Sequence, residues 1–462
     1  MRLARLAAVT VALTILAAAG ARAATWTAPM TLRTCAPATD PKVVFPFSAP
    51  STRSGRGAIL WLGGAPSCAG AGGAAQALDS ATLHTDDLAS VPRTAISGHD
   101  LLGPLESAGT TAGQLVAIVG DAGNPVAGHP GALLGEGLAG GPLHDLTELG
   151  GPDAPVATAD GYIGDADIVT TATSLGGAQL IELREQRHYA YSFGRPVILT
   201  EGFAPITALA VGLDFRGDSL VLWAQGGEVH AQWVSNMRQV YPPQVLGPAG
   251  YAPQLAPVLS DNGHGFAMWT DEPAPGTPGE ARIYLEHSAN NVVFPAAPHL
   301  LAAFPEPAAQ RLTPGSIALV RMTPSEGVLA AWTLLQGDNY VVQAAGLTAT
   351  QVLPAATIAQ PGTDLRLAAL ATGPNNDVVA VLESAPRSAA GFDATQQAIL
   401  AARSVPGGPG GVAFEAPTQL APPGPNSAPS VAIDPNSDRA VVAWQTLVGA
   451  MPAVAYAVRD RT

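Results

Sequence analysis

The sequence predicts an all-β chain in which a unit of about four short strands is repeated around an axis until the ring closes. Three observations predict this fold class. An apolar run recurs at a regular spacing, a proline-containing segment follows several of these runs, and a segment of the same kind stands near the start of the chain.

Short apolar runs recur along the whole chain, and most follow a turn rich in Gly, Asn, Asp or Ser, as strands do. Their spacing averages about 55 residues, which is typical of folds built from repeated units. The runs are continuous rather than alternating, which indicates strands that are covered on both faces. They end at positions 61, 118, 171, 223, 269, 332, 382 and 444.

A unit of this size cannot cover both faces of its own sheet, so neighbouring units must cover each other. Packing around a central axis achieves this, and the resulting fold is a β-propeller. The runs predict one propeller of eight blades. Seven blades are the alternative, because residues 43–150 are the most diverged and Gly-rich part of the repeat. The tryptophans that end several runs are interpreted as core residues between blades.

The proline-containing segment is interpreted as the outermost strand of each blade, because proline is tolerated at a sheet edge. Residues 414–420 (Phe-Glu-Ala-Pro-Thr-Gln-Leu) match residues 193–199, and residues 26–32 (Trp-Thr-Ala-Pro-Met-Thr-Leu) have the same pattern. The last unit ends after its third strand. We therefore expect segment 25–33 to supply the missing outer strand and to close the ring beside residues 454–458.

Residues 25–462 resemble the β-propeller superfamily, and within it the secreted bacterial repeat proteins that superficially resemble sialidases. The resemblance rests on repeat period, strand order and ring closure, so it implies a fold and no activity. The sialidase Asp box, Ser-x-Asp-x-Gly-x-x-Trp, has its nearest counterpart between Ser260 and Trp269, where the offsets differ. The sialidase arginine triad has no assigned counterpart.

The first residues predict export. Arg2 and Arg5 precede an apolar run over 6–19, and a small-x-small cleavage site follows that ends at Ala23. This order of segments is typical of a secretory signal peptide. We expect residues 1–23 to be removed and residues 24–462 to form the secreted or extracytoplasmic propeller, with no membrane span.

The charge balance limits the partners. The chain has 22 Lys and Arg against 36 Asp and Glu, a formal net charge of −14. This argues against nucleic acid as a partner, because phosphate binding needs a basic face. The expected partner is an unknown protein, a glycan or a cationic ligand, and the protein is expected to be a monomer.

The two cysteines, Cys35 and Cys68, are expected to form a disulfide, because exported proteins retain such bonds. Cys35 follows the closing strand, and Cys68 follows the second strand of the first blade. Both positions lie on the face of a propeller that carries the second-to-third-strand turns and the links between blades. The bond would fasten the N-terminal strand at the seam of the ring.

No catalytic, cofactor-binding or metal-binding residue is assigned, and no cofactor is expected. The sequence therefore favours a non-catalytic binding or scaffold protein, with a glycan-acting hydrolase or lyase at one mouth as the alternative. The residues that end the second strands are candidates for a polar rim that could attract a cation. They are Asp121, Gln225, Asp271, Glu272, Asp338, Glu383 and Gln445.

Overall fold

The protein is described by a computed structural model in which the chain is all-β. The described residues contain strands β1 to β34 and one 3-10 turn, η1 (Ala394–Gln396). Within these residues there is no helix long and apolar enough to cross a membrane. The described ranges are 25–32, 38–45, 57–63, 75–83, 89–90, 92–109, 114–121, 131–138, 144–150, 157–160, 165–186, 193–260, 262–274, 276–288, 293–295, 297–306, 316–322, 327–337, 339–348, 351–358, 363–373, 375–388, 391–406 and 412–459.

Four sheets of four antiparallel strands occupy the middle of the chain, and each runs up and down in sequence order. They are β9 (Ala157–Asp160), β10 (Ala166–Thr173), β11 (Gln179–Gln186) and β12 (Val197–Gly202); β13 (Ile206–Leu213), β14 (Ser219–Gln225), β15 (Glu228–Val234) and β16 (Gln244–Pro248); β17 (Leu255–Leu259), β18 (Gly265–Asp271), β19 (Gly279–Ser288) and β20 (His299–Glu306); and β21 (Ile317–Arg321), β22 (Val328–Gln336), β23 (Asn339–Leu347) and β24 (Ala356–Ile358).

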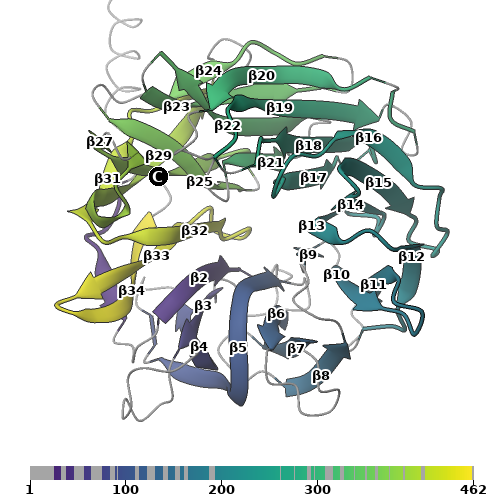
Figure 1. Cartoon of the computed structure of the whole chain (residues 1–462). Coiled ribbons are helices and arrows are strands. Elements are labelled where there is room, and N and C mark those ends of the chain that lie inside the picture. The colour runs from purple at the N-terminus through teal and green to yellow at the C-terminus, as the bar shows by residue number, and fades with distance from the viewer. Residues whose placement is uncertain are drawn as a thin grey trace, which may run out of the picture.

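Two further sheets follow toward the C-terminus, and the last one includes the first strand of the chain. Their strands are β25 (Asp364–Thr372), β26 (Val378–Ala385), β29 (Gln397–Pro406), β30 (Val412–Phe414) and β31 (Thr418–Gly424), then β32 (Ser427–Ile433), β33 (Ala440–Val448), β34 (Met451–Arg459) and β1 (Met30–Leu32). A small hairpin, β27 (Arg387–Ser388) with β28 (Gly391–Phe392), lies between β26 and β29. The sheets lie side by side around a common centre, as in a β-propeller (Figure 1).

The first two predicted units are joined into one sheet of seven strands. The first half of β5 pairs with β4, and its second half, from Leu101 onward, pairs with β6 (Figure 1). One strand therefore serves as the outer strand of one unit and the inner strand of the next, where a separate link was expected. The seven strands are β2 (Ala38–Val44), β3 (Gly57–Gly63), β4 (Ala75–Leu83), β5 (Arg93–Gly109), β6 (Gln114–Asp121), β7 (Gly131–Leu138) and β8 (His144–Gly150).

The core lies between the sheets. Eight apolar clusters of described residues each join one sheet, or one half of the seven-stranded sheet, to the next. Trp223 packs with Val169 and Leu183 of the preceding sheet, and Trp444 packs with Val379 of the sheet before its own. The strands are continuously apolar because each sheet is covered on both faces.

The tryptophans of the repeated runs are buried, which confirms their interpretation as core residues. Each tryptophan lies on the second strand of its sheet, directly opposite a residue of the third strand, which in turn lies opposite a residue of the fourth strand, and the three residues form a row. Trp223 faces His230 and stacks on it at 5.1 Å between ring centroids, and Trp269 faces Tyr284 at 5.4 Å. The rows are Trp61–Asp79–Thr94, Trp223–His230–Val245, Trp269–Tyr284–Leu300, Trp332–Gln343–Thr357 and Trp444–Ala455–Thr31.

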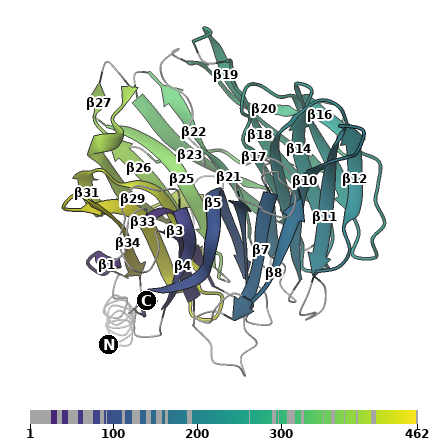
Figure 2. The same ribbon diagram turned by 60° about the horizontal axis from the view of Figure 1, so that its bottom comes forward.

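The N-terminal strand β1 pairs antiparallel with β34, the strand expected beside it (Figure 2). The first and last sheets also pack directly, since Trp61 shares a cluster with Val441 and Tyr456. The Tyr456 hydroxyl accepts a hydrogen bond from the Ala89 backbone N–H at 2.9 Å. Both ends of the chain are thus held in one cluster.

Deletion of residues 24–33 is expected to lower the thermal midpoint and to favour aggregation. The deletion removes the ladder between β1 and β34, and it exposes the backbone of β34 as a new sheet edge. Thermal unfolding and light scattering of the deletion variant beside the parent check this. A variant that keeps the parent's midpoint and remains monomeric would contradict it.

One buried carboxyl makes the folded state sensitive to pH. Glu286 in β19 is 4% exposed, and one of its oxygens accepts a hydrogen bond from the His287 N–H at 3.3 Å. The other oxygen has no hydrogen-bond partner among the described residues. Burial raises the pKa of Glu286 to about 7, although the hydrogen bond from His287 opposes the rise. Burial likewise raises the pKa of Asp214 to about 6.

Glu286→Gln is expected to stabilise the protein at pH 8 more than at pH 5. The folded state holds a proton that the unfolded chain loses near pH 4.5, so stability falls as pH rises from about 4.5 through about 7. The uncharged glutamine side chain removes this loss of stability at high pH, while Asp214 still contributes its own pH dependence in both proteins. Thermal midpoints across this range measure it, with exposed Glu415→Gln as the control. A gain that is equal at both pH values would refute the assignment.

Candidate functional site

The rim is the face that carries the second-to-third-strand turns and the links from one sheet to the next. Of the seven residues predicted there, Gln225 donates from Nε2 to the Ala204 carbonyl at 2.8 Å. Asp271 lies 3.8 Å from Arg282. Glu272 is buried, and its carbonyl accepts the Tyr251 N–H at 2.9 Å. These residues hold the rim loops in place.

Three other predicted residues are less fully described. Gln445 is half-buried opposite Ser427 in the last sheet. Asp121 ends β6, but its side chain lies outside the described residues, as does the whole of Asp338. Cys35 and Cys68 also lie outside the described residues, so the disulfide stays a prediction.

Glu383 is the predicted rim residue with the most unusual surroundings. Its side chain is 8% exposed and faces Arg366 across the β25–β26 ladder. Burial raises the pKa of this carboxyl, while the neighbouring Gln397 amide and the charge of Arg366 oppose the rise. The Arg366 guanidinium carbon lies 4.8 Å from the centre of the Tyr340 ring. A carboxyl that is protonated more readily than usual, beside an arginine, could act as a general acid.

The neighbourhood of Glu383 also joins two sheets. Asn426 donates from Nδ2 to the Gln397 carbonyl at 2.7 Å and to the Pro422 carbonyl at 2.9 Å. Its side-chain oxygen accepts the Thr446 hydroxyl at 2.8 Å. These bonds fix the start of β32 against β29, so the surroundings of Glu383 are rigid.

The rim also exposes large apolar side chains that the sequence analysis missed. Phe203 is 82% exposed and Tyr251 is 55% exposed, and both lie in links between sheets. The two links have the same sequence pattern, Gly-aromatic-Ala-Pro, at residues 202–205 and 250–253. This repeated Gly-aromatic-Ala-Pro pattern is the sequence feature from which the two exposed aromatic residues could have been predicted. Leu175, in the β10–β11 turn, is also exposed.

These loops form one continuous band, which we call the rim band and define as residues 174–178, 201–205, 225–228, 248–253 and 271–272. Glu201 pairs with Leu180 next to the turn that holds Leu175. The Gln225 bond to Ala204 joins the first link to the β14–β15 turn, and the Ala249 N–H reaches the Gly227 carbonyl at 2.9 Å. Each step along the band is therefore fixed by a hydrogen bond or a strand pair.

Two glycine positions show how tightly the band is built. Gly226 and Gly227 form the β14–β15 turn with φ of 65° and 85°, a conformation that suits a tight hairpin. A side chain at Gly250 would place its Cβ 2.2 Å from the backbone N and O of Glu272. The Tyr251 ring therefore projects from a backbone that cannot shift freely.

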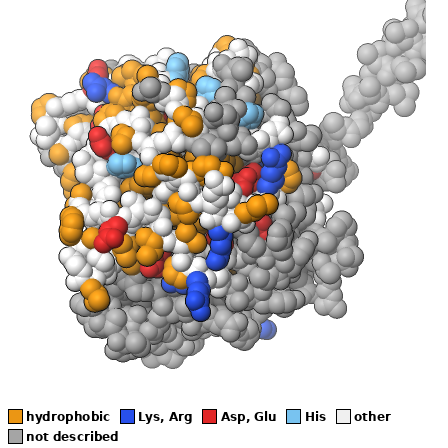
Figure 3. All heavy atoms as spheres, turned by 90° about the vertical axis from the view of Figure 1, so that its right-hand side faces the viewer, with side chains coloured by type: hydrophobic (Ala, Val, Ile, Leu, Met, Phe, Trp, Pro, Cys, Tyr) orange, Lys and Arg blue, Asp and Glu red, His pale blue; other side chains and the backbone are white. Residues whose placement is uncertain are grey.

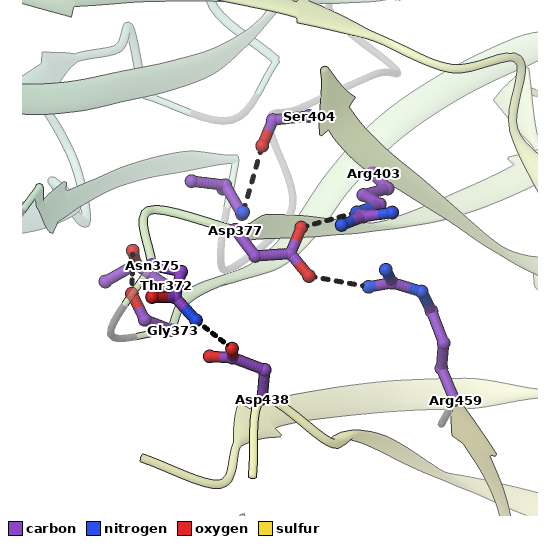
Figure 4. A network of polar contacts seen from close by, with 9 residues as sticks. Thr372, Gly373, Asn375, Asp377, Arg403, Ser404, Asp438 and Arg459 are labelled. Atoms are coloured by element: carbon purple, nitrogen blue, oxygen red, sulfur yellow. Dashed lines mark hydrogen bonds and ion pairs between the residues drawn. The ribbon is translucent and has the colours of Figure 1, made fainter. Parts of the chain in front are cut away.

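The opposite face carries a dense polar network of a different kind (Figure 4). Asp377 accepts hydrogen bonds from Arg403 at 2.7 Å and from Arg459 at 2.9 Å, one on each oxygen. Nearby, Asn375 donates to Asp438 of the last sheet. Because Arg459 ends β34 and Asp377 precedes β26, the network joins the last two sheets. Its carboxylate is fully paired, so its role is structural.

A third polar group lies on the inner strands. Lys42, the only lysine of the chain, lies 3.4 Å from Asp40 and 3.9 Å from Glu106. Burial disfavours the charged amine, but the two carboxylates outweigh it and raise the pKa of Lys42. The pairs join β2 to β5. The part of the chain that the structure describes holds no group of three or more His, Cys, Asp or Glu suited to a metal ion.

No protein-family model and no curated protein matches the chain. Among solved structures, a protein of unknown function from Dyadobacter fermentans is 10% identical, with 96% of this chain and 100% of that chain covered and a TM-score of 0.42. A mutant of the NanB sialidase from Streptococcus pneumoniae is 8% identical, with 92% and 68% covered and a TM-score of 0.40. An ulvan lyase is 10% identical, with 90% and 93% covered and a TM-score of 0.44. Each is a distant likeness.

Proposed function

We propose that this protein is an exported, monomeric binding protein whose ligand surface is the rim band. One observation carries the proposal: Phe203 and Tyr251 stand exposed at equivalent positions of consecutive links. Removing an aromatic side chain from water lowers the free energy of the system. A rigid backbone that keeps two such side chains exposed therefore favours a partner that covers them. Their repeated placement distinguishes them from scattered surface residues.

We further propose that the fold is a closed propeller of eight blades. The eight apolar clusters support it, because one of them joins the first sheet to the last. Counting the seven-stranded sheet as two blades that share β5 gives one blade for each of the eight runs of the sequence. The deletion of residues 24–33 tests the closure.

Export and the disulfide are proposals from the sequence that can be tested together. Expression with the native leader is expected to yield a secreted protein that begins at Ala24, with no reactive thiol after unfolding without reductant. N-terminal sequencing and intact mass measure the cleavage of the leader. Thiol titration measures the disulfide, and light scattering measures whether the protein is a monomer. An intact leader, or two thiol equivalents, would overturn the corresponding proposal.

The binding proposal is tested on residues 24–462 with a glycan array and a panel of labelled peptides, the ligand classes expected from the sequence. Phe203→Ser and Tyr251→Ser are expected to reduce binding of any ligand found, because they remove the exposed rings. Met237→Ser is the matched control, since Met237 is 89% exposed in a turn on the opposite face. Equal losses in all three variants, or none in the rim variants, would refute the rim band as the site.

A glycan-acting hydrolase or lyase is the second candidate, and the Glu383–Arg366 pair is the observation that favours it. A carboxyl with a raised pKa is suited to act as the general acid that protonates the leaving oxygen of a glycosidic bond. A screen of hydrolase and lyase substrates is expected to show activity that Glu383→Gln abolishes while the fold is retained. Activity that survives Glu383→Gln would remove this residue from the proposal.

A further inference from the structure

We infer that the partner of the rim band is an arginine-bearing segment of another protein, an inference that rests on the proposed function. The observations are the two exposed aromatic rings and the carboxylates that lie between and beside them. Glu201 precedes the link that holds Phe203, and Glu228 begins β15 opposite Pro248, three residues before Tyr251. Both carboxylates are exposed.

Acidic side chains dominate the charge along this edge of the three sheets from β9 to β20. Glu280, the second residue of β19, is a third exposed carboxylate. The described cation beside it is Arg282, which lies 3.2 Å from Glu280 and 3.8 Å from Asp271 and is therefore shared by two carboxylates. His230 lies 4.0 Å from Glu228. The edge therefore keeps carboxylates in excess.

Exposed arginines of the same sheets lie on the opposite face. Arg216 is in the β13–β14 turn and Arg238 in the β15–β16 turn, and Arg195 precedes β12 at the same end. Figure 3 shows the flank between the two faces, with most of its Lys and Arg side chains toward one side of the view and hydrophobic side chains across the middle. Arg238 is paired with the buried Glu185 at 3.0 Å, so the argument rests on the rim, where the exposed carboxylates outnumber the described arginine and favour a cation.

The chemistry favours arginine over lysine. A guanidinium group is planar, stacks on an aromatic face and pairs with a carboxylate through two parallel hydrogen bonds. The rim band offers both elements within one rigid strip of loops, since Glu201 at the end of β12 stands two residues before Phe203 in the sequence. A lysine ammonium uses the carboxylate but gains less from the ring.

The test uses a fluorescent peptide of nine arginines, with peptides of nine lysines and of a neutral Gly-Ser repeat for comparison, against the mature protein. Anisotropy is expected to show that the arginine peptide binds more tightly than the lysine peptide and that the neutral peptide does not bind. Phe203→Ser with Tyr251→Ser is expected to weaken arginine-peptide binding about three- to tenfold. Glu228→Gln is expected to weaken it as well.

The net charge of the protein attracts any basic peptide, so the controls remove the same charge or the same hydrophobicity elsewhere. Glu415→Gln removes one exposed carboxylate of another sheet, and Met237→Ser removes an exposed apolar side chain of the opposite face. Weakening by Glu415→Gln equal to that by Glu228→Gln would overturn the inference. So would equal affinity for the arginine and lysine peptides.

The same variants separate this inference from the proposed function. If a glycan binds and loses affinity in the aromatic double variant while the arginine peptide does not, the rim band is the site and the inference about its partner is wrong. If no ligand responds to the double variant, both are wrong. Thermal midpoints near the parent's show that these exposed substitutions leave the fold intact.

Discussion

Burial of each sheet's two apolar faces by its neighbours is the constraint on which the rest of the structure depends. A four-stranded sheet of this size has little interior of its own, so its strands are stable only between two other sheets. The tryptophans show how the faces are matched. Trp269 packs on the preceding sheet and donates from its ring nitrogen to the Pro248 carbonyl at 3.1 Å. The ring nitrogens of Trp223 and Trp332 have no hydrogen-bond partner among the described residues, so it is the burial of the rings that the equivalent tryptophans share.

The residues that hold the sheets together are different from the exposed rim residues that are proposed to bind a ligand. The inter-sheet clusters and the Asp377 network hold the sheets together at the core and at one face. The rim loops have short backbones that are fixed by hydrogen bonds, and Phe203 and Tyr251 are exposed on them. That arrangement resembles the general rule that function is placed on loops supported by a rigid scaffold.

Repetition made the fold predictable, because each strand type is sampled several times. The repeated pattern predicted the buried tryptophans, the prolines of the outer strands and the partner of β1. The shared strand β5 was not predicted, since it replaces a link with an irregular strand that pairs on both sides, at a point where the repeat is most diverged. The proposed sites were harder to predict. Glu383 was a candidate because it ends a second strand, and its role stays a prediction. Phe203 and Tyr251 were not candidates because aromatic residues are absent from catalytic motifs, although their links repeat the same four-residue pattern.

The continuity of β5 has a consequence for how the chain can change over time. Links made of loops accept insertions, because added residues extend into solvent. Within β5 the pairing with β4 shifts register between Ser97 and Leu101, and the pairing with β6 shifts register between Leu102 and Leu105. A residue inserted between these positions can be taken up by a bulge. A residue inserted after Leu105, where β5 and β6 pair without interruption, would turn the following side chains to the opposite face. Length variation at this junction is therefore expected within residues 97–105 and not beyond them.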